Sequence, residues 1–400
     1  MPQISNRAEL APFSPIRKLV PLARKAKKQG VEIFYLNIGQ PDFETPCAIK
    51  KSLCQYQKCG PENIPYAPSE GIYDAILAWQ KYYKDYNIKV NPEDIIITTG
   101  GSEAIIFSMA VICDPRDEII VFEPFYANYK TYAKFLGIKL LPITLSIKNG
   151  FHLPEAKKII SKITKKTKAI LVCNPSNPAG IVLSKKEIKT IVRIAKRYKL
   201  FILADEVYRE FIFNGEEHIS FMHFSEVKNQ VILLDSVSKR FNACGVRIGV
   251  LVSKNKKVMQ NALKFAQARL SVATTEQKAI IPLLLNSRPY TKKLIAQYRK
   301  RRDVVFEGLK NIPGVVCQKP EGAFYVIAKL PIDSSEKFCR WLLEKFRYKN
   351  KTVFLAPASD FYMTPGLGRS EARIAYVLNE KKLAEAMKIL KRAVLEYNKQ

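Results

Sequence analysis

The chain has 400 residues, 47% of them hydrophobic, which is enough to bury a large core and suggests two domains or one large domain with a smaller partner. No run approaches the roughly 18 uninterrupted apolar residues of a membrane-spanning helix, and the start lacks the order of a secretory signal, so we expect a cytoplasmic protein with no membrane partner. The 66 Lys and Arg against 36 Asp and Glu give a net charge of +30, which we interpret as a lysine-rich solvated surface because no nucleic-acid-binding motif accompanies it.

The middle of the chain alternates short apolar runs with amphipathic stretches, a pattern typical of a parallel sheet covered by helices. Over 184–198, Ile188, Ile191, Val192 and Ala195 recur at the spacing of one helix face. Runs rich in β-branched residues predict strands over 94–98, 118–122, 169–173, 201–204, 231–234 and 247–252. We therefore expect an α/β domain here.

The pattern changes beyond about residue 285. The sequence then predicts a basic helix over 290–311, a strand within 322–327, a helix over 338–346, a strand over 373–377 and a last amphipathic helix. This order indicates a separate α+β domain, against which the short N-terminal segment should pack. The predicted division is 49–285 for the large domain, and 1–48 with 286–400 for the small domain.

Four polar segments lie at or near the carboxyl ends of predicted strands, where open α/β sheets place their ligand sites. Thr99-Gly-Gly-Ser-Glu-Ala104 follows a strand and opens a predicted helix, so its backbone N–H groups and the helix dipole can bind a phosphate. Taken alone, a Gly-Gly turn before a helix is also common. Asn174-Pro-Ser-Asn-Pro-Ala-Gly180 follows another strand, and its two Asn-Pro pairs predict either an extended loop that projects an amide or a plain turn.

The other two segments carry titratable groups. Ala204-Asp-Glu-Val-Tyr208 puts a carboxylate at a strand end and a tyrosine three residues later, although such an acid can also be a helix cap. Asp235-Ser-Val-Ser-Lys239 puts a lysine among hydroxyl groups, and an arginine follows in Gly245-Val-Arg-Ile-Gly249. An amine held in a pocket explains this lysine better than a surface charge does. The eight cysteines and three histidines lack metal-ligand spacing, so we expect no metal site.

In this order and combination, the segments resemble the pyridoxal-phosphate-dependent aminotransferases of fold type I, class I and II, the aspartate aminotransferase group. The resemblance runs from Asn37-Ile-Gly-Gln-Pro-Asp-Phe43 to Arg373-Ile-Ala-Tyr376, nearly the whole chain. It implies a large domain with a mainly parallel seven-stranded sheet covered by helices, and a smaller α+β domain formed by both chain ends. It further implies pyridoxal 5′-phosphate as cofactor and a homodimer with shared active sites.

The resemblance implies a role for each residue around the cofactor ring. Lys239 resembles the Schiff-base lysine, which also moves a proton between the substrate Cα and the cofactor. Asp205 resembles the carboxylate that pairs with the pyridine nitrogen and keeps the ring protonated as an electron acceptor. Tyr208 and Asn177 resemble the pair that hydrogen-bonds the phenolic oxygen O3′. Tyr126 stands where an aromatic ring stacks on the pyridine, a place where many relatives have Trp.

The same resemblance assigns residues to two anionic groups. The cofactor phosphate is expected to bind Gly101, Ser102, Ser236 and Arg247, with Tyr66 contributed by the neighbouring subunit. The substrate α-carboxylate is expected to bind Arg373, assisted by Asn177 and the backbone of Gly39.

Selectivity for dicarboxylic substrates requires a second cation, for the distal carboxylate. One branch of the family has a Lys after the Gly-Ser step of the phosphate loop, where this chain has Glu103, whose charge would repel a second carboxylate. Another branch sends an Arg across from the other subunit, out of a segment that 267–276 roughly matches. Arg269 is therefore either the distal clamp or a structural or surface arginine. The first case favours aspartate or glutamate, and the second an aromatic or aliphatic amino acid.

The expected activity is a ping-pong transfer of the amino group of an L-α-amino acid, with aspartate or glutamate favoured, to a 2-oxo acid such as 2-oxoglutarate. One alternative is an aminotransferase for aromatic or aliphatic amino acids. Another is a lyase of the same fold, such as a C–S lyase, because such lyases share the Lys, Asp, Tyr and phosphate site. A regulator would need a fused DNA-binding domain, and a non-enzymatic module would need a broken lysine, whereas Lys239 is intact.

Overall fold

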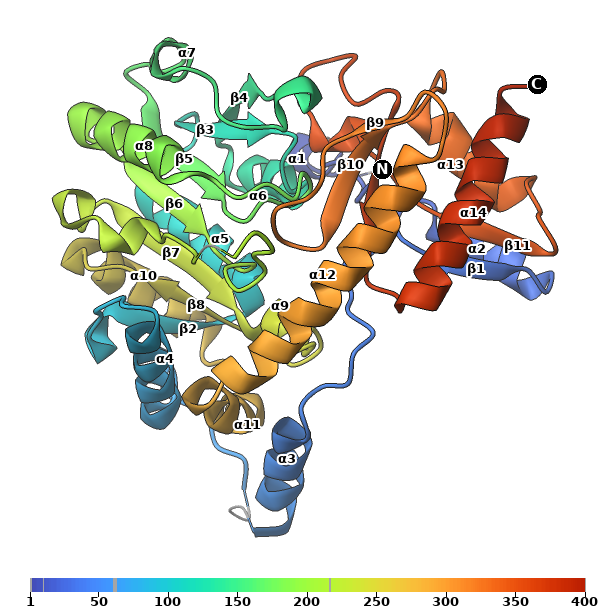
Figure 1. Ribbon diagram of the computed structural model, residues 1–400. Helices are drawn as coiled ribbons and strands as arrows, with labels where there is room; N and C mark the ends of the chain where they lie inside the picture. The colour runs from blue at the N-terminus through green and yellow to red at the C-terminus, as the bar shows by residue number, and fades with distance from the viewer. Residues whose placement is uncertain (1, 10, 60–62, 216, 400) are drawn as a thin grey trace.

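The computed structural model describes residues 2–9, 11–59, 63–215 and 217–399. Its larger part is built on a seven-stranded sheet of order β2-β8-β7-β6-β5-β3-β4 (Figure 1). The strands are β2 (Ile95–Thr99), β3 (Glu118–Glu123), β4 (Lys139–Thr144), β5 (Thr167–Cys173), β6 (Phe201–Asp205), β7 (Val231–Ser236) and β8 (Ile248–Val252). Only β8 runs antiparallel to its neighbours, β2 and β7, so the predicted mainly parallel seven-stranded sheet is confirmed.

Two details of the sheet differ from the sequence prediction. Strand β4 was not predicted, because Pro142 interrupts its apolar run and a proline cannot donate to a central ladder. Its position explains the proline, since β4 is an edge strand that pairs with β3 alone. Strand β8 begins at Ile248 rather than at Arg247, because Arg247 has a left-handed φ of 57° that is incompatible with an extended strand.

Helices cover both faces of the sheet, as predicted. Ile96 packs into the layer under α5, α6 and α10, whereas its neighbour Ile97 packs under α4, α8 and α11, because successive strand residues point to opposite faces. These helices are α4 (Tyr73–Asp85), α5 (Gly100–Ile112), α6 (Asn128–Leu136), α8 (Lys185–Tyr198), α10 (Lys256–Arg269) and α11 (Thr274–Leu285). Ser184 and Glu187 form a capping box at the start of α8, which fixes that helix where the sequence placed it.

Both ends of the chain form the smaller α+β part, which confirms the expectation from the resemblance. Strand β1 (Glu32–Tyr35) pairs in parallel with β11 (Lys351–Phe354). A second sheet has the order β12-β13-β10-β9 and contains β9 (Val316–Cys317), β10 (Tyr325–Lys329), β12 (Ala356–Pro357) and β13 (Glu371–Ala375). The helices here are α2 (Val20–Lys28), α13 (Ser335–Glu344) and α14 (Glu380–Tyr397). The boundaries at residues 49 and 285 stay a prediction.

Long helix α12 (Arg288–Lys310) runs along the front of both parts in Figure 1, while α3 (Cys47–Cys59) extends below them beside α11. The remaining helices are α1 (Asn6–Glu9), α7 (Ala156–Ile160), α9 (Val237–Arg240) and the 3-10 turns η1 (Pro92–Asp94), η2 (Ile147–Asn149), η3 (Phe221–His223), η4 (Ser225–Val227) and η5 (Ser359–Phe361). The loop after β6 joins the two parts, because the Tyr208 and Phe211 rings lie 5.2 and 5.3 Å from Phe324 of the small-domain core.

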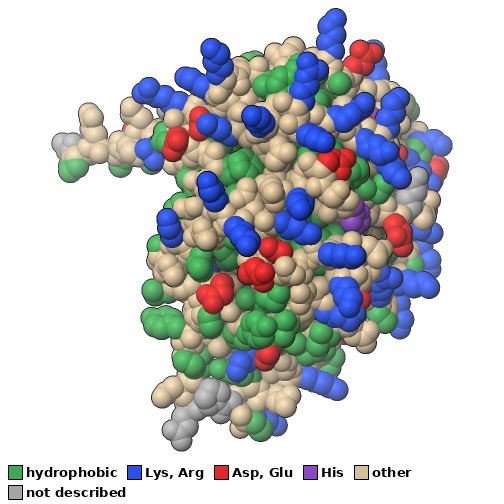
Figure 2. Space-filling model, turned by 90° about the vertical axis from the view of Figure 1, so that its left-hand side faces the viewer, with side chains coloured by type: hydrophobic (Ala, Val, Ile, Leu, Met, Phe, Trp, Pro, Cys, Tyr) green, Lys and Arg blue, Asp and Glu red, His purple; other side chains and the backbone are tan. Residues whose placement is uncertain are grey.

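Lys and Arg side chains are distributed over the face drawn in Figure 2, with Asp and Glu among them. This distribution agrees with a solvated basic surface. None of the helices in the described ranges is both long enough and apolar enough to cross a membrane.

Candidate active site

A cavity of about 730 Å³ opens at the carboxyl ends of β5, β6 and β7, where the small domain faces the sheet. Of the residues predicted from the sequence, those that line it are Gly39, Gly101, Ser102, Tyr126, Asn177, Asp205, Tyr208, Ser236, Lys239, Arg247 and Arg373. In the part of the chain that the structure describes, Tyr66 and Arg269 do not line this cavity. Segments more than 300 residues apart in the sequence are thus brought together around one space.

Lys239 is presented to the cavity by the short helix α9. Ser236, at the end of β7, caps this helix by accepting a hydrogen bond from the backbone N–H of Ser238 at 3.2 Å. The half-buried Lys239 Nζ donates to the carbonyl oxygen of Gly39 at 2.8 Å and lies 3.8 Å from Cys244 Sγ. The amine is therefore held on the cavity wall by a contact from the small domain.

The backbone at Gly39 can approach this closely only without a side chain. A Cβ there would lie 1.8 Å from the hydroxyl oxygen of Tyr325. Tyr325 Oη is also 2.9 Å from Tyr208 Oη, so the two phenols share a hydrogen bond inside the cavity wall. Tyr325 lines the cavity but was not predicted, since nothing in its local sequence distinguishes it from a core aromatic residue.

Asp205 ends β6 with its carboxylate buried in the cavity floor. It accepts hydrogen bonds from Tyr129 Oη at 2.5 Å and from the backbone N–H of Val207 at 3.3 Å. Burial raises the pKa of Asp205 from its ordinary value of 3.8 to about 6, against the opposing effect of these donors. A cationic N–H group beside this carboxylate would stabilise its charged form. Tyr129, a positioning residue for Asp205, was missed because the contact spans 76 residues.

Arg373, on β13, is almost completely buried at 1% exposure. Its Nη1 donates to Asn177 Oδ1 at 3.1 Å, and its Nη2 donates to the carbonyl oxygen of Asn37 at 2.5 Å. Its Nε has no hydrogen-bond partner among the described residues. A buried guanidinium with an unused donor, at the wall of a cavity, is suited to a carboxylate.

Asn177 reaches Arg373 from the loop 174–180, for which the sequence predicted either an extended conformation or a turn. The loop is a turn, closed by the N–H of Gly180, which donates to the carbonyl oxygen of Ser176 at 3.0 Å. Gly180 has a φ of +73°, and a Cβ there would lie 2.4 Å from the carbonyl oxygen of Tyr325. This close approach fixes the turn and with it the direction of the Asn177 amide.

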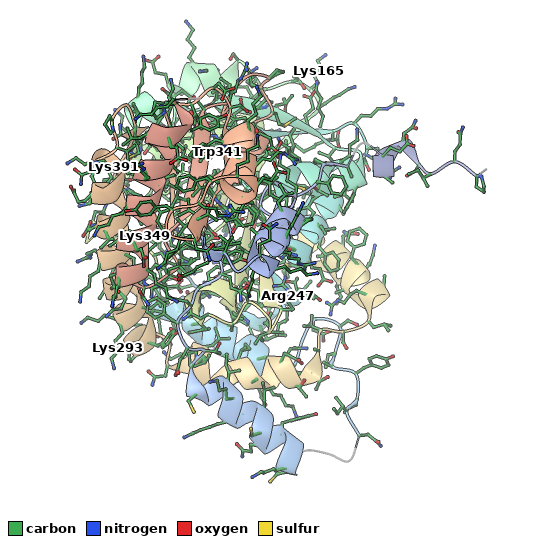
Figure 3. The ribbon with its side chains drawn as sticks, turned by 90° about the vertical axis from the view of Figure 1, so that its right-hand side faces the viewer. Lys165, Arg247, Lys293, Trp341, Lys349 and Lys391 are labelled. Atoms are coloured by element: carbon green, nitrogen blue, oxygen red, sulfur yellow. The ribbon has the colours of Figure 1, made fainter. Side chains whose placement is uncertain are left out.

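The start of α5 has a glycine loop packed against an arginine. A Cβ at Gly100, whose φ is +72°, would lie 2.5 Å from Arg247 Nη2, so the guanidinium lies against this loop. A Cβ at Gly249 would lie 2.5 Å from the carbonyl carbon of Gly100, so β8 also packs directly on it. Arg247 lies near the middle of the view in Figure 3, whereas Lys165 lies at its periphery. Free N–H groups of a helix N-terminus beside an arginine are a binding site for phosphate.

Tyr126 lines the cavity next to the floor. Its hydroxyl oxygen accepts from Asn128 Nδ2 at 2.8 Å, and its ring meets that of Tyr129 edge-on at 5.4 Å. These two contacts orient an aromatic ring at the cavity, and its stacking role stays a prediction. Burial raises the pKa of Tyr126 well above the usual range, so the phenol is neutral.

A buried ionic cluster lies directly behind Lys239. Arg240 Nη2 is 2.6 Å from Asp235 Oδ1, and its Nε is 2.9 Å from Glu210 Oε1, with all three side chains at most 2% exposed. Asp235 belongs to β7 and Glu210 to the loop after Asp205. The cluster therefore locks the helix that carries Lys239 to the loop that follows Asp205.

Arg269 and Glu103, the residues expected to decide substrate range, lie beside each other. Arg269 Nε is 3.5 Å from Glu103 Oε1, and its Nη2 donates to the carbonyl oxygens of Ser69 and Ile97. Glu103 Oε2 accepts from the backbone N–H of Thr99 at 2.8 Å. Within one protomer both charges are thus engaged away from the cavity. A reach of Arg269 into a neighbouring subunit stays a prediction.

The fold and these residues define the class of protein. The cavity combines a lysine amine, a buried carboxylate, and an arginine beside the N-terminus of a helix, at the carboxyl edge of a sheet covered on both faces. These groups fit pyridoxal phosphate, which carries an aldehyde, a ring nitrogen and a phosphate. The arrangement is that of a pyridoxal-phosphate-dependent enzyme of fold type I.

Comparison with known proteins gives the family. The family model for aminotransferase class I and II matches residues 31–390. The chain is 33% identical over 396 residues to an aspartate aminotransferase of Pyrococcus horikoshii, covering 98% of this chain and 97% of that one. It is 29% identical to an aspartate/prephenate aminotransferase of Thermus thermophilus, covering 91% and 92% of the two chains.

Solved structures agree. The aspartate aminotransferase from Thermus thermophilus with maleate superposes with a TM-score of 0.89 at 28% identity, and the alanine aminotransferase from Pyrococcus furiosus with 0.89 at 30%. Each comparison covers 98% of this chain and 100% of the other. The chain belongs to the class I and II aminotransferases, which use pyridoxal phosphate.

Proposed function

We propose that this aminotransferase moves the amino group of an L-α-amino acid, with aspartate or glutamate favoured, to a 2-oxo acid such as 2-oxoglutarate by a ping-pong mechanism. The observation that carries the proposal is the presence of Lys239 Nζ, the Asp205 carboxylate and the buried Arg373 guanidinium in the wall of one cavity. Aspartate is the substrate named for several of the relatives, which supports a dicarboxylic donor for this chain.

Each cavity residue then has a defined task. Pyridoxal phosphate, when bound, supplies an electron sink for the electrons of the substrate Cα–H bond. Lys239, whose Nζ donates to the Gly39 carbonyl oxygen at the cavity wall, would hold the cofactor covalently until the substrate displaces it, and the freed Nζ would then take up the Cα proton. Asp205, oriented by Tyr129, pairs with the ring nitrogen. Arg373 binds the substrate α-carboxylate, which orients the Cα–H bond.

The remaining residues bind the cofactor's other groups. We assign Tyr208 and Asn177, which line the cavity, to hydrogen bonds with its phenolic oxygen, and the ring of Tyr126 to stacking on the pyridine. The phosphate-binding residues are proposed to be Gly101, Ser102, Ser236 and Arg247. The helix dipole of α5 adds to the charge of Arg247 at this end of the cavity.

We also propose a homodimer in which Tyr66 completes the phosphate site of the partner subunit. Tyr66 is 80% exposed, and the exposed apolar side chain of Leu270 belongs to a neighbouring segment. The two segments are joined, since Thr274 Oγ1 donates to the carbonyl oxygen of Pro65 and Arg269 donates to that of Ser69. Such a face is typical of a subunit contact. Sedimentation equilibrium measures the mass, and a monomer would contradict the proposal.

The substrate is tested by half-reactions. Holoenzyme is mixed with one amino acid at a time, without a 2-oxo acid, and pyridoxamine phosphate is quantified by chromatography. Aspartate and glutamate should convert the cofactor fastest. If an aromatic amino acid converts it while both dicarboxylic ones do not, the substrate assignment is wrong. Release of pyruvate and ammonia instead of pyridoxamine phosphate would favour a C–S lyase.

The assignment of Lys239 is tested separately. Borohydride treatment of holoenzyme should add the mass of the reduced cofactor to the intact chain, and Lys239→Ala should abolish this addition. Lys293→Ala, at an exposed position on α12, is the matched control and should retain it. Retention of the added mass in Lys239→Ala would refute the assignment.

A further inference from the structure

The cavity contains more positive charge than the cofactor and the α-carboxylate account for. Its described lining residues include four cations, Arg17, Lys239, Arg247 and Arg373, and one carboxylate, that of Asp205. Under the proposed function, Lys239 is used covalently, Arg247 binds the phosphate, Arg373 binds the α-carboxylate, and Asp205 pairs with the ring nitrogen. Among the described lining residues, Arg17 is the one cation to which the proposed function assigns no task.

Arg17 is held at the cavity by its two neighbours in the chain. On one side, the carbonyl oxygen of Ile16 accepts from Asn37 Nδ2 at 2.8 Å. On the other side, Lys18 Nζ is 2.6 Å from both Asp360 Oδ2 and Glu336 Oε2. The backbone N–H of Arg17 itself donates to the carbonyl oxygen of Ser14 at 3.0 Å, closing a turn. The position of the Arg17 backbone is therefore fixed from both sides.

The Arg17 guanidinium, in contrast, is exposed and has no hydrogen-bond or ion-pair partner within the described ranges. Asn37 also connects the segment of Arg17 to the proposed α-carboxylate site. The same residue that binds Ile16 through its side chain accepts from Arg373 Nη2 through its carbonyl oxygen. Asn37 thus connects the segment that carries the unpaired Arg17 guanidinium to Arg373, which binds the α-carboxylate under the proposed function.

The other candidate cation is already neutralised. Arg269 is paired with Glu103 and hydrogen-bonded to two backbone carbonyl oxygens, so moving it to a substrate would leave the Glu103 carboxylate, which is only 15% exposed, without that partner. No comparable cost opposes an ion pair between Arg17 and a substrate.

We propose that Arg17 binds the distal carboxylate of the dicarboxylic substrate and so determines the preference for aspartate or glutamate. The clamp comes from the same chain as Arg373, not from the neighbouring subunit. This inference rests on the proposed function and assigns its substrate selectivity to one side chain. An arginine suits the task because its planar fork can bind both oxygens of a carboxylate.

The experiment compares Arg17→Gln with the unmodified holoenzyme in two measurements. In calorimetric titrations, the ratio of the Kd for propionate to the Kd for succinate should fall by about 10- to 100-fold, the usual effect of losing a charged hydrogen bond. The ratio of kcat/KM for aspartate to kcat/KM for alanine should fall by a similar factor. Arg17→Lys should recover part of both ratios, because it keeps the charge and loses the fork.

Two control variants separate this role from others. Arg24→Gln removes an equal charge from an exposed position on α2, and should change neither ratio. Glu103→Gln combined with Arg269→Gln removes that ion pair without leaving one charge alone, and should lower the ratios less than Arg17→Gln does. A larger fall of both ratios in the double variant than in Arg17→Gln would overturn the inference in favour of Arg269. An equal fall in Arg24→Gln would also overturn it, because the effect would then come from the overall charge of the protein rather than from Arg17.

The inference and the proposed function can fail separately. If the unmodified enzyme prefers dicarboxylic substrates and Arg17→Gln keeps both ratios, the role of Arg17 is refuted while the function stands. If the unmodified enzyme does not prefer aspartate or glutamate, both are refuted.

Discussion

Asp205→Asn should make the cofactor-free protein more stable at neutral pH while weakening its hold on the cofactor. The carboxylate is buried, and its pKa is raised to about 6 by that burial. An asparagine has nearly the same shape and can still accept the hydrogen bond from Tyr129. The substitution therefore removes the charge and one of the two acceptor oxygens, so that the longer hydrogen bond, from the backbone N–H of Val207 at 3.3 Å, loses its acceptor.

The size of the effect follows from proton linkage. The folded chain holds the Asp205 proton up to about pH 6, whereas the unfolded chain releases it near the ordinary value of 3.8. The folded state thus binds more protons in this window, and the free energy of unfolding falls as the pH rises through it. At about 1.4 kcal/mol per unit, the complete loss is about 3 kcal/mol, of which about 2.4 kcal/mol falls between pH 4 and pH 7.

Denaturant titrations of both proteins, freed of cofactor, measure the free energy of unfolding at pH 4 and pH 8. The free energy of unfolding of Asp205→Asn minus that of the unmodified protein should be about 2.4 kcal/mol larger at pH 8 than at pH 4. With pyridoxal phosphate bound the order should reverse at pH 8, because the charged carboxylate then has a cationic partner. An equal difference at both pH values would refute burial as the cause of the shifted pKa.

Three further substitutions test other parts of the site. Arg373→Lys should raise KM for amino acids and lower kcat/KM by about 10- to 100-fold, since the charge stays and the fork is lost; a fall confined to kcat would contradict its role in binding. Gly249→Ala should weaken cofactor binding about tenfold or more in equilibrium dialysis, because the new Cβ meets Gly100 at 2.5 Å; unchanged affinity would refute that contact. Arg240→Met should lower the free energy of unfolding by about 3–5 kcal/mol, since Asp235 is left buried and unpaired; a loss below about 1 kcal/mol, the range of surface pairs, would contradict this.

The parts of the fold that local patterns determine were predictable. Strand β7 and helix α8 have strong periodicity and clear ends, so their positions followed from residues a few places apart. The cavity residues carried by motifs, such as Asp205 and Lys239, were found because each motif lies at a strand end. Strand β4 was missed because Pro142 contradicts the local pattern and only the position of the strand at the edge explains it.

Contacts between distant segments could not be read from the sequence. Tyr129 and Tyr325 look like ordinary core aromatic residues, and their roles arise only when α6 and β10 reach the cavity. Likewise, the pairing of Glu103 with Arg269 joins residues that sequence reasoning treated as separate determinants of substrate range. Arg17 had no motif around it, and its place at the cavity follows from contacts with Asn37 and the small domain.

The proline in β4 also limits how molecules of this protein can associate. An exposed sheet edge is a template on which a strand of another molecule can add and start aggregation. Pro142 has no N–H to offer such a strand, and Lys139, largely exposed at the start of β4, adds a charge that an added strand would have to bury. The sheet therefore resists growth from one molecule to the next at this edge.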